Sequence, residues 1–158
     1  MARVSRRRVI DADVGEVWAL ISDPYHLPRW WPRATRVENV HQVPGGRRSH
    51  WTLVLSTKSG KPVRADYRCT SSAEPKRYAW EQDVADTPFE RIVRRSGMEI
   101  LLRGADGGTE VTLESEQALR GLSRLGSPMM RRANKRTLAE ALDGLESALG
   151  GGEEAPAP

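Results

Sequence analysis

The chain has one cysteine, Cys69, among 158 residues, so it can form neither an intrachain disulfide nor a cysteine-based metal cluster. It also lacks any run of the roughly 20 apolar residues that a membrane-spanning helix needs. Its first six residues, Met1 to Arg6, already carry charge and contain no apolar signal core. These absences predict a cytoplasmic protein with no membrane span.

Residue patterns for known chemistry are also missing. The three histidines, His26, His41 and His50, do not have the spacing of metal ligands on a shared helical turn. No phosphate-binding loop, dinucleotide fingerprint or nucleophile elbow occurs, and neither Cys69 nor any serine has a recognisable base partner. The sequence therefore predicts no metal and no cofactor, and it leaves the catalytic residues unknown.

The net charge of +4 raises the question of a nucleic-acid partner. The arginines that produce this charge are dispersed, for example at residues 6–8, 47–48, 94–95 and 131–132. Acidic residues lie between these groups along the whole chain. Because dispersed charge is typical of a solvated surface, the pattern argues against nucleic-acid binding.

Hydrophobic periodicity predicts the order of the elements. A strand at 3–10 is followed by a helix at 14–22, a short helix at 25–30, six strands in hairpin sequence between 37 and 119, and a helix at 128–149. The strand after the turn at 74–76 is expected to run from Tyr78 to Val84, and the next to begin near Ile92. This order is α+β. We expect a seven-stranded, curved antiparallel sheet to wrap the long C-terminal helix around an internal cavity, as one domain at 1–150 with a disordered tail at 151–158.

Three stretches of this sequence resemble a known family. They are Val9 to Pro32, the turn and strand Glu74 to Trp80, and the C-terminal stretch Met129 to Leu149. They resemble START-like proteins, and within these the bacterial polyketide cyclase/dehydrase and lipid-transport group (SRPBCC). The resemblance implies a helix-grip fold that holds a hydrophobic ligand between helix and sheet.

Tryptophan is abundant, with five residues against one phenylalanine. Trp51, Tyr67, Tyr78 and Trp80 share strand parity with apolar neighbours and should face the helix, whereas His50 should face outward. Large aromatics of this kind either fill a core or line a ligand pocket, and both interpretations remain open. The predicted ligand-binding residues are Trp30, Trp51, Leu53, Tyr67, Tyr78, Trp80, Gln82, Met98, Gln117, Met130, Asn134 and Leu138.

Arg6 and Arg8 share the strand parity of Val4 and Ile10, so one of them is expected to point inward, and Arg8 is the further polar candidate. An arginine that points inward without an acidic partner would favour an anionic group on the ligand. Gln82, Gln117 and Asn134 are expected to orient the ligand by hydrogen bonding.

Three functions remain open at this point. The first is binding of a hydrophobic small molecule such as a lipid, a polyketide or an isoprenoid-like compound. The second is a polyketide aromatase or cyclase, for which the sequence offers no convincing acid–base pair. The third is a protein-interaction module that docks through its basic surface or its last helix. The sequence also leaves open whether the protein forms a homodimer.

Overall fold

The computed structural model describes residues 2–121 and 127–150. The predicted tail at 151–158 lies outside the described residues. In chain order the elements are β1 (Ala2–Ile10), α1 (Val14–Ile21), the short 3₁₀ helix η1 (Pro24–His26), α2 (Leu27–Trp30), β2 (Ala34–His41), β3 (His50–Ser56), β4 (Pro62–Ala73), β5 (Arg77–Gln82), η2 (Pro88–Arg91), β6 (Val93–Ala105), β7 (Gly108–Leu119) and α3 (Ser127–Gly150).

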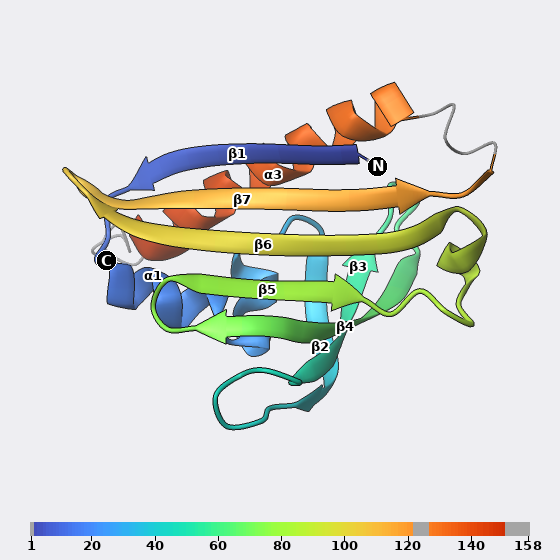
Figure 1. Ribbon diagram of the computed structural model, residues 1–158, viewed down its shortest axis with the longest axis horizontal. Coiled ribbons are helices and arrows are strands. Elements are labelled where there is room, and N and C mark those ends of the chain that lie inside the picture. Colours follow the sequence, from blue (N-terminus) through green and yellow to red (C-terminus); the bar gives the residue numbers. More distant parts are fainter. Residues whose placement is uncertain (1, 122–126, 151–158) are drawn as a thin grey trace.

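The seven strands form one antiparallel sheet in the order β1-β7-β6-β5-β4-β3-β2. Figure 1 shows that β2 and β3 are turned steeply against β1, β7 and β6, so that the sheet bends, and that α3 passes behind it. The expected α+β helix-grip architecture is confirmed. Among the described residues, no helix is both long and apolar enough to cross a lipid bilayer.

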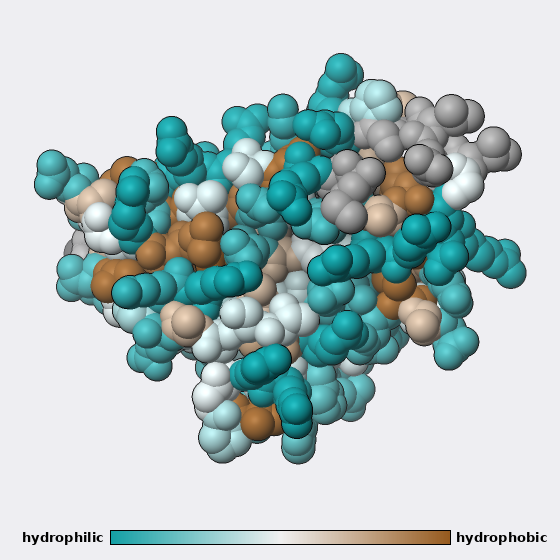
Figure 2. Space-filling view, in the orientation of Figure 1, coloured by the Kyte–Doolittle hydropathy of each residue, from teal (hydrophilic) through white to brown (hydrophobic). Residues whose placement is uncertain are grey.

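The outer face of the sheet is hydrophilic (Figure 2). Opposite charges face each other across neighbouring strands, as in the pair Arg3–Glu116 at 2.7 Å and the pair Arg103–Glu110 at 2.9 Å. Exposed pairs of this kind contribute roughly 0–1 kcal/mol each. Their main effect is to keep this face polar, so the apolar face of the sheet turns toward the helices.

Helix α3 packs on the sheet through a stripe at helical spacing. Leu138, Ala141, Leu142 and Leu145 are each at most 1% exposed, and they follow the i, i+3, i+4, i+7 pattern. Gly144 lies on the side of α3 that meets α2. A Cβ atom at this position would lie 2.1 Å from the carbonyl oxygen of Trp30, so only glycine lets the two helices approach this closely.

Strand β2 begins at Ala34 rather than at residue 37, and two boundaries around the β5–β6 connection also differ from the prediction. Strand β5 ends at Gln82, so Val84 lies in the turn that follows, although its side chain is buried. Ile92 lies between η2 and β6 and is 50% exposed. Pro88 begins η2 and has no N–H group to donate to a sheet. The chain therefore leaves the sheet between these strands, which alternation alone did not indicate.

Candidate functional site

Six aromatic side chains pack together between the sheet and α2, and we refer to them as the aromatic cluster. Trp80 of β5 lies at the centre of this cluster, and its five neighbours come from α2, β3, β4, β5 and the residue after α2. The separations between ring centroids are 5.5 to 6.5 Å. The members are Trp30, Trp31, Trp51, Tyr67, Tyr78 and Trp80.

The aromatic cluster lies in the part of the interior where the sequence predicted either a filled core or the wall of a ligand pocket. Trp30, Trp51, Tyr78 and Trp80 are at most 5% exposed. Most of their contacts are edge-on, which aromatic rings favour. These side chains are therefore buried and packed against one another.

The cluster holds polar atoms that lack partners. The indole Nε1 atoms of Trp30 and Trp51, and Nε2 of Gln82, are buried without a hydrogen-bond acceptor among the described residues. Burial also raises the pKa of the Tyr67 phenol to about 12, because the charged form would be poorly solvated. The interior therefore favours neutral groups and has spare donors for an acceptor.

Two predicted polar residues bond to each other. Asn134 Nδ2 on α3 donates to Gln117 Oε1 on β7 at 3.1 Å, and Gln117 Nε2 donates to Ser96 Oγ on β6 at 3.3 Å. This chain of hydrogen bonds fastens α3 to the sheet. Asn134 and Gln117 thus bond to each other and link α3 to β7.

Arg8 does have acidic partners, so the condition for an anionic ligand group is not met. Its guanidinium donates to Asp143 at 2.7 Å and also to Glu146, both on α3. Hydrogen bonding to Asp143 is the largest of the effects that raise the pKa of Arg8. Arg8 therefore joins β1 to α3, and its charge does not call for an anionic ligand. The sequence could not reveal this pairing because the partners lie more than 130 residues away.

An open hollow of about 630 Å³ lies next to the aromatic cluster, and we call it the α3 hollow. It is bounded by α3, the link from α2 to β2, the β3–β4 hairpin and η2. The residues from α3 recur at i, i+3, i+4 and i+7, so they form one helical face adjacent to the buried one. The lining residues are Trp31, Pro32, Arg33, Leu55, Ser56, Thr57, Lys58, Val63, Phe89, Ala133, Arg136, Thr137 and Glu140.

Trp31 connects the hollow with the aromatic cluster. Its ring lies edge-on to Trp80 at 5.6 Å and to Trp30 at 5.5 Å, while its side chain is only half-buried. Leu55 and Val63 are directly paired across β3 and β4 and form the neighbouring wall. Apolar side chains thus continue from the mouth of the hollow to the core.

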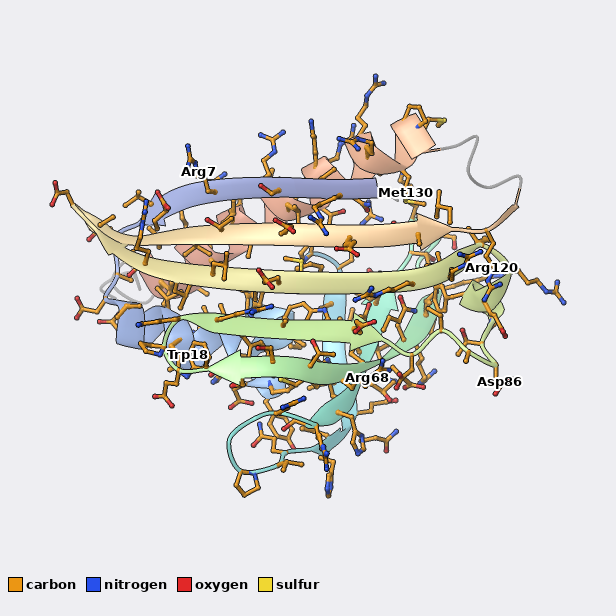
Figure 3. The ribbon with its side chains drawn as sticks, viewed as in Figure 1. Arg7, Trp18, Arg68, Asp86, Arg120 and Met130 are labelled. Carbon is orange, nitrogen blue, oxygen red and sulfur yellow. The ribbon has the colours of Figure 1, made fainter. Side chains whose placement is uncertain are left out.

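None of the twelve predicted ligand-binding residues lines the α3 hollow. Leu53, Met98 and Leu138 belong to the core, and Met130 is half-buried near the start of α3 (Figure 3). A second hollow of about 710 Å³ does contain Gln82, beside Val84 and several charged residues. Whether any of the twelve binds a ligand stays a prediction.

The sequence analysis did not predict Trp31 and Phe89 as site residues, although a feature of the sequence indicates each of them. Trp31 directly follows Trp30, and in an extended segment adjacent side chains point in different directions. Phe89 is the only phenylalanine of the chain, and it stands in the connection between β5 and β6. An isolated aromatic in a loop needs an apolar contact, which here is the hollow.

The histidines do not build a reactive site. His41 and His50 stack on each other at 5.0 Å on the exposed side of β2 and β3, so His50 does face outward. Within residues 2–121 and 127–150, no three His, Cys, Asp or Glu side chains are grouped so that they could hold a metal ion.

This fold and its sequence can now be compared with known proteins. The family model described as "Polyketide cyclase / dehydrase and lipid transport" matches residues 1–150. The chain belongs to this family. The resemblance inferred from the sequence is thereby confirmed. None of the curated proteins is similar enough to match the chain.

Several solved structures share this fold at low sequence identity. A START superfamily protein from Mycobacterium smegmatis has a TM-score of 0.78 at 15% identity, with 96% of this chain and 99% of that chain covered. A protein from Thermus thermophilus has a TM-score of 0.75 at 19% identity, with the same coverage. The di-domain ARO/CYC protein of the steffimycin biosynthetic pathway has a TM-score of 0.78 at 8% identity, and covers 96% of this chain but 52% of that one.

Proposed function

We propose that this protein binds a hydrophobic small molecule, of lipid, polyketide or isoprenoid-like character, in the α3 hollow. The observation that carries the proposal is the open hollow itself, whose volume of about 630 Å³ lies within the range of roughly 300–1,000 Å³ typical of ligand pockets. The family description points the same way, since it names polyketides and lipids.

The contacts explain how such a ligand would be held. Trp31, Leu55 and Val63 offer apolar surface, and burying it contributes roughly 25 cal/mol per Å². Trp31 is the only member of the aromatic cluster that lines the α3 hollow, so it would be the contact between the ligand and the core. If its ring moved aside, the unpartnered Nε1 groups of Trp30 and Trp51 could donate to a carbonyl or hydroxyl oxygen of the ligand.

The cyclase alternative is also named in the family description. Catalysis at an enolisable carbon needs an acid or base placed next to it. The aromatic cluster offers Tyr67 and Tyr78, and burial raises the pKa of both phenols, so that neither is a base near neutral pH. Binding is therefore the function that we carry forward.

A binding test with a neutral probe would examine this function directly. Dodecanol should raise the midpoint of thermal unfolding in proportion to the logarithm of its concentration, because it binds only the folded state. It should also change the tryptophan fluorescence, since Trp31 lines the hollow.

A variant in which a large side chain fills the α3 hollow tests whether the hollow is the binding site. In Ala133→Trp, a large ring on an exposed face of α3 would occupy the space, and dodecanol binding should be lost while the fold remains. Ala19→Trp, the same change at an exposed position of α1, is the matched control and should bind normally. Equal dodecanol binding by the two variants would rule out the α3 hollow as the site.

A further inference from the structure

The rim of the α3 hollow carries excess positive charge. Arg33 comes from the link between α2 and β2, Lys58 from the β3–β4 turn, and Arg136 from α3, so three separate segments each bring one cation to the same hollow. Glu140 is the only carboxylate among the lining residues. The rim therefore has three positive charges and one negative charge.

These three cations differ from most arginines of the sheet. Arg3, Arg77, Arg95 and Arg103 each lie within 4.0 Å of a carboxylate oxygen. In the part of the chain that the structure describes, Arg33, Lys58 and Arg136 have no carboxylate oxygen within that distance. Glu140 stands one turn after Arg136 on α3, yet these two side chains are not paired. The charge of the rim is thus free to act on a ligand.

The backbone at Arg33 adds a second observation. Its φ angle is +66°, in the left-handed region that glycine adopts easily and that other residues occupy at a cost. Its carbonyl oxygen accepts a hydrogen bond from the Ser56 N–H at 2.9 Å, which fixes this turn against the end of β3. Strained backbone tends to occur at functional sites. The turn thus holds an arginine at the rim, in a backbone conformation that glycine would adopt without strain.

We propose that the ligand of the α3 hollow is an amphipathic anion, with an apolar body and one carboxylate or phosphate group. The inference rests on the proposed function and deepens it. The apolar body would lie against Trp31, Leu55 and Val63. The anionic group would lie at the rim, where a guanidinium forms charge-assisted hydrogen bonds with carboxylates and phosphates.

Four probes with the same dodecyl chain separate charge from apolar contact: dodecanoate, dodecyl phosphate, dodecanol and dodecyltrimethylammonium. Each is titrated below its micelle threshold, with tryptophan fluorescence and calorimetry as readouts. At low salt we expect an anionic probe to bind at least about tenfold more tightly than dodecanol, and this advantage should shrink as added salt screens the rim. The two anionic probes show whether the head group is a carboxylate or a phosphate.

Variants that remove one positive charge from the rim test whether Lys58 and Arg136 bind the anionic group. Lys58→Gln and Arg136→Gln should each weaken binding of the anionic probe about threefold to tenfold and leave dodecanol unchanged. Arg103→Gln, which removes the same charge from the outer face of the sheet, is the matched control and should leave both affinities unchanged. Thermal unfolding of every variant establishes that it is folded.

The outcomes distinguish this inference from the proposed function. If dodecanol binds as tightly as both anions, or if the rim variants bind the anions like the wild type, the inference fails while the proposed function stands. If dodecyltrimethylammonium bound most tightly, the inference would be overturned, since the carboxylate of Glu140 would then determine which charge the rim binds. If no probe binds, the proposed function fails and this inference fails with it.

Discussion

Replacing Gly144 with alanine tests the contact that brings α2 and α3 together. By helix propensity alone this change should stabilise α3, since alanine is favoured over glycine by about 0.8–1.0 kcal/mol in a helix interior. The new Cβ atom, however, would lie 2.1 Å from the Trp30 carbonyl oxygen and 2.9 Å from its carbonyl carbon. Both contacts are with backbone, so no side-chain rotation relieves them, and the helices must part by more than about 1 Å to reach an ordinary van der Waals distance.

The expected magnitude follows from these opposing effects. Overpacking of a core costs typically 1–3 kcal/mol, and a clash with backbone belongs at the upper end of that range. After subtraction of the propensity gain, we expect Gly144→Ala to lose about 2 kcal/mol of unfolding free energy. For a protein of this size that loss lowers the unfolding midpoint by about 4–8 °C. Urea titrations followed by tryptophan fluorescence, together with thermal scans, measure both quantities.

A matched control exists on α1. Gly15 is exposed, and a Cβ atom there would meet nothing within 4 Å, so Gly15→Ala should raise stability by up to about 1 kcal/mol. The two substitutions are chemically identical, and the packing argument predicts opposite signs for them. If Gly144→Ala also raised the unfolding midpoint, the reasoning about the α2–α3 contact would be refuted.

Three further predictions concern charge and ionisation. Arg8→Met should destabilise the protein by about 1 kcal/mol, because it removes the two ion pairs that join β1 to α3. The loss should be smaller at high salt. A loss of unfolding free energy that is independent of salt in denaturant titrations would contradict this. The pKa of the Tyr67 phenol is raised from 10.0 to about 12, so its stabilising contribution is complete below pH 10 and is lost as the pH rises toward 12. Stability measured over that range should therefore fall more steeply in the wild type than in Tyr67→Phe. Hydrogen bonds from Arg64 and Arg36 lower the pKa of Glu38. The contribution of Glu38 to stability is therefore present above pH 4.5 and is lost on acidification. Glu38→Gln should make stability fall less steeply at acid pH, and an unchanged pH profile would contradict the stabilising role of Glu38.

The fold could be predicted from the sequence to a large extent. Alternation along Trp51, Leu53 and Leu55 identified β3, and the apolar stripe through Leu138, Ala141 and Leu145 identified α3 within one residue at each end. The stripe on α3 reflects burial of one face, which is a local property of the helix. In β3 the intervening Thr52 and Val54 are buried as well, which alternation did not indicate. The family resemblance was local in the same sense, because it depended on short runs of residues.

The candidate site could be predicted only in part. Parity placed Trp51, Tyr67, Tyr78 and Trp80 on the inner face, where all four lie in the aromatic cluster. It could not indicate that their rings would pack together around Trp80, since that depends on how the strands and α2 come together.

The sequence by itself thus determined the elements, their buried faces and the family, because each of these follows from residues close together in the chain. Only the tertiary structure decided where a ligand could lie. The α3 hollow combines residues 31–33, 55–58, 63, 89 and 133–140, which lie far apart in the chain and meet only when the sheet bends toward the helix. The same bend brings Arg33, Lys58 and Arg136 to one rim, and a charge that is dispersed in sequence becomes concentrated in space.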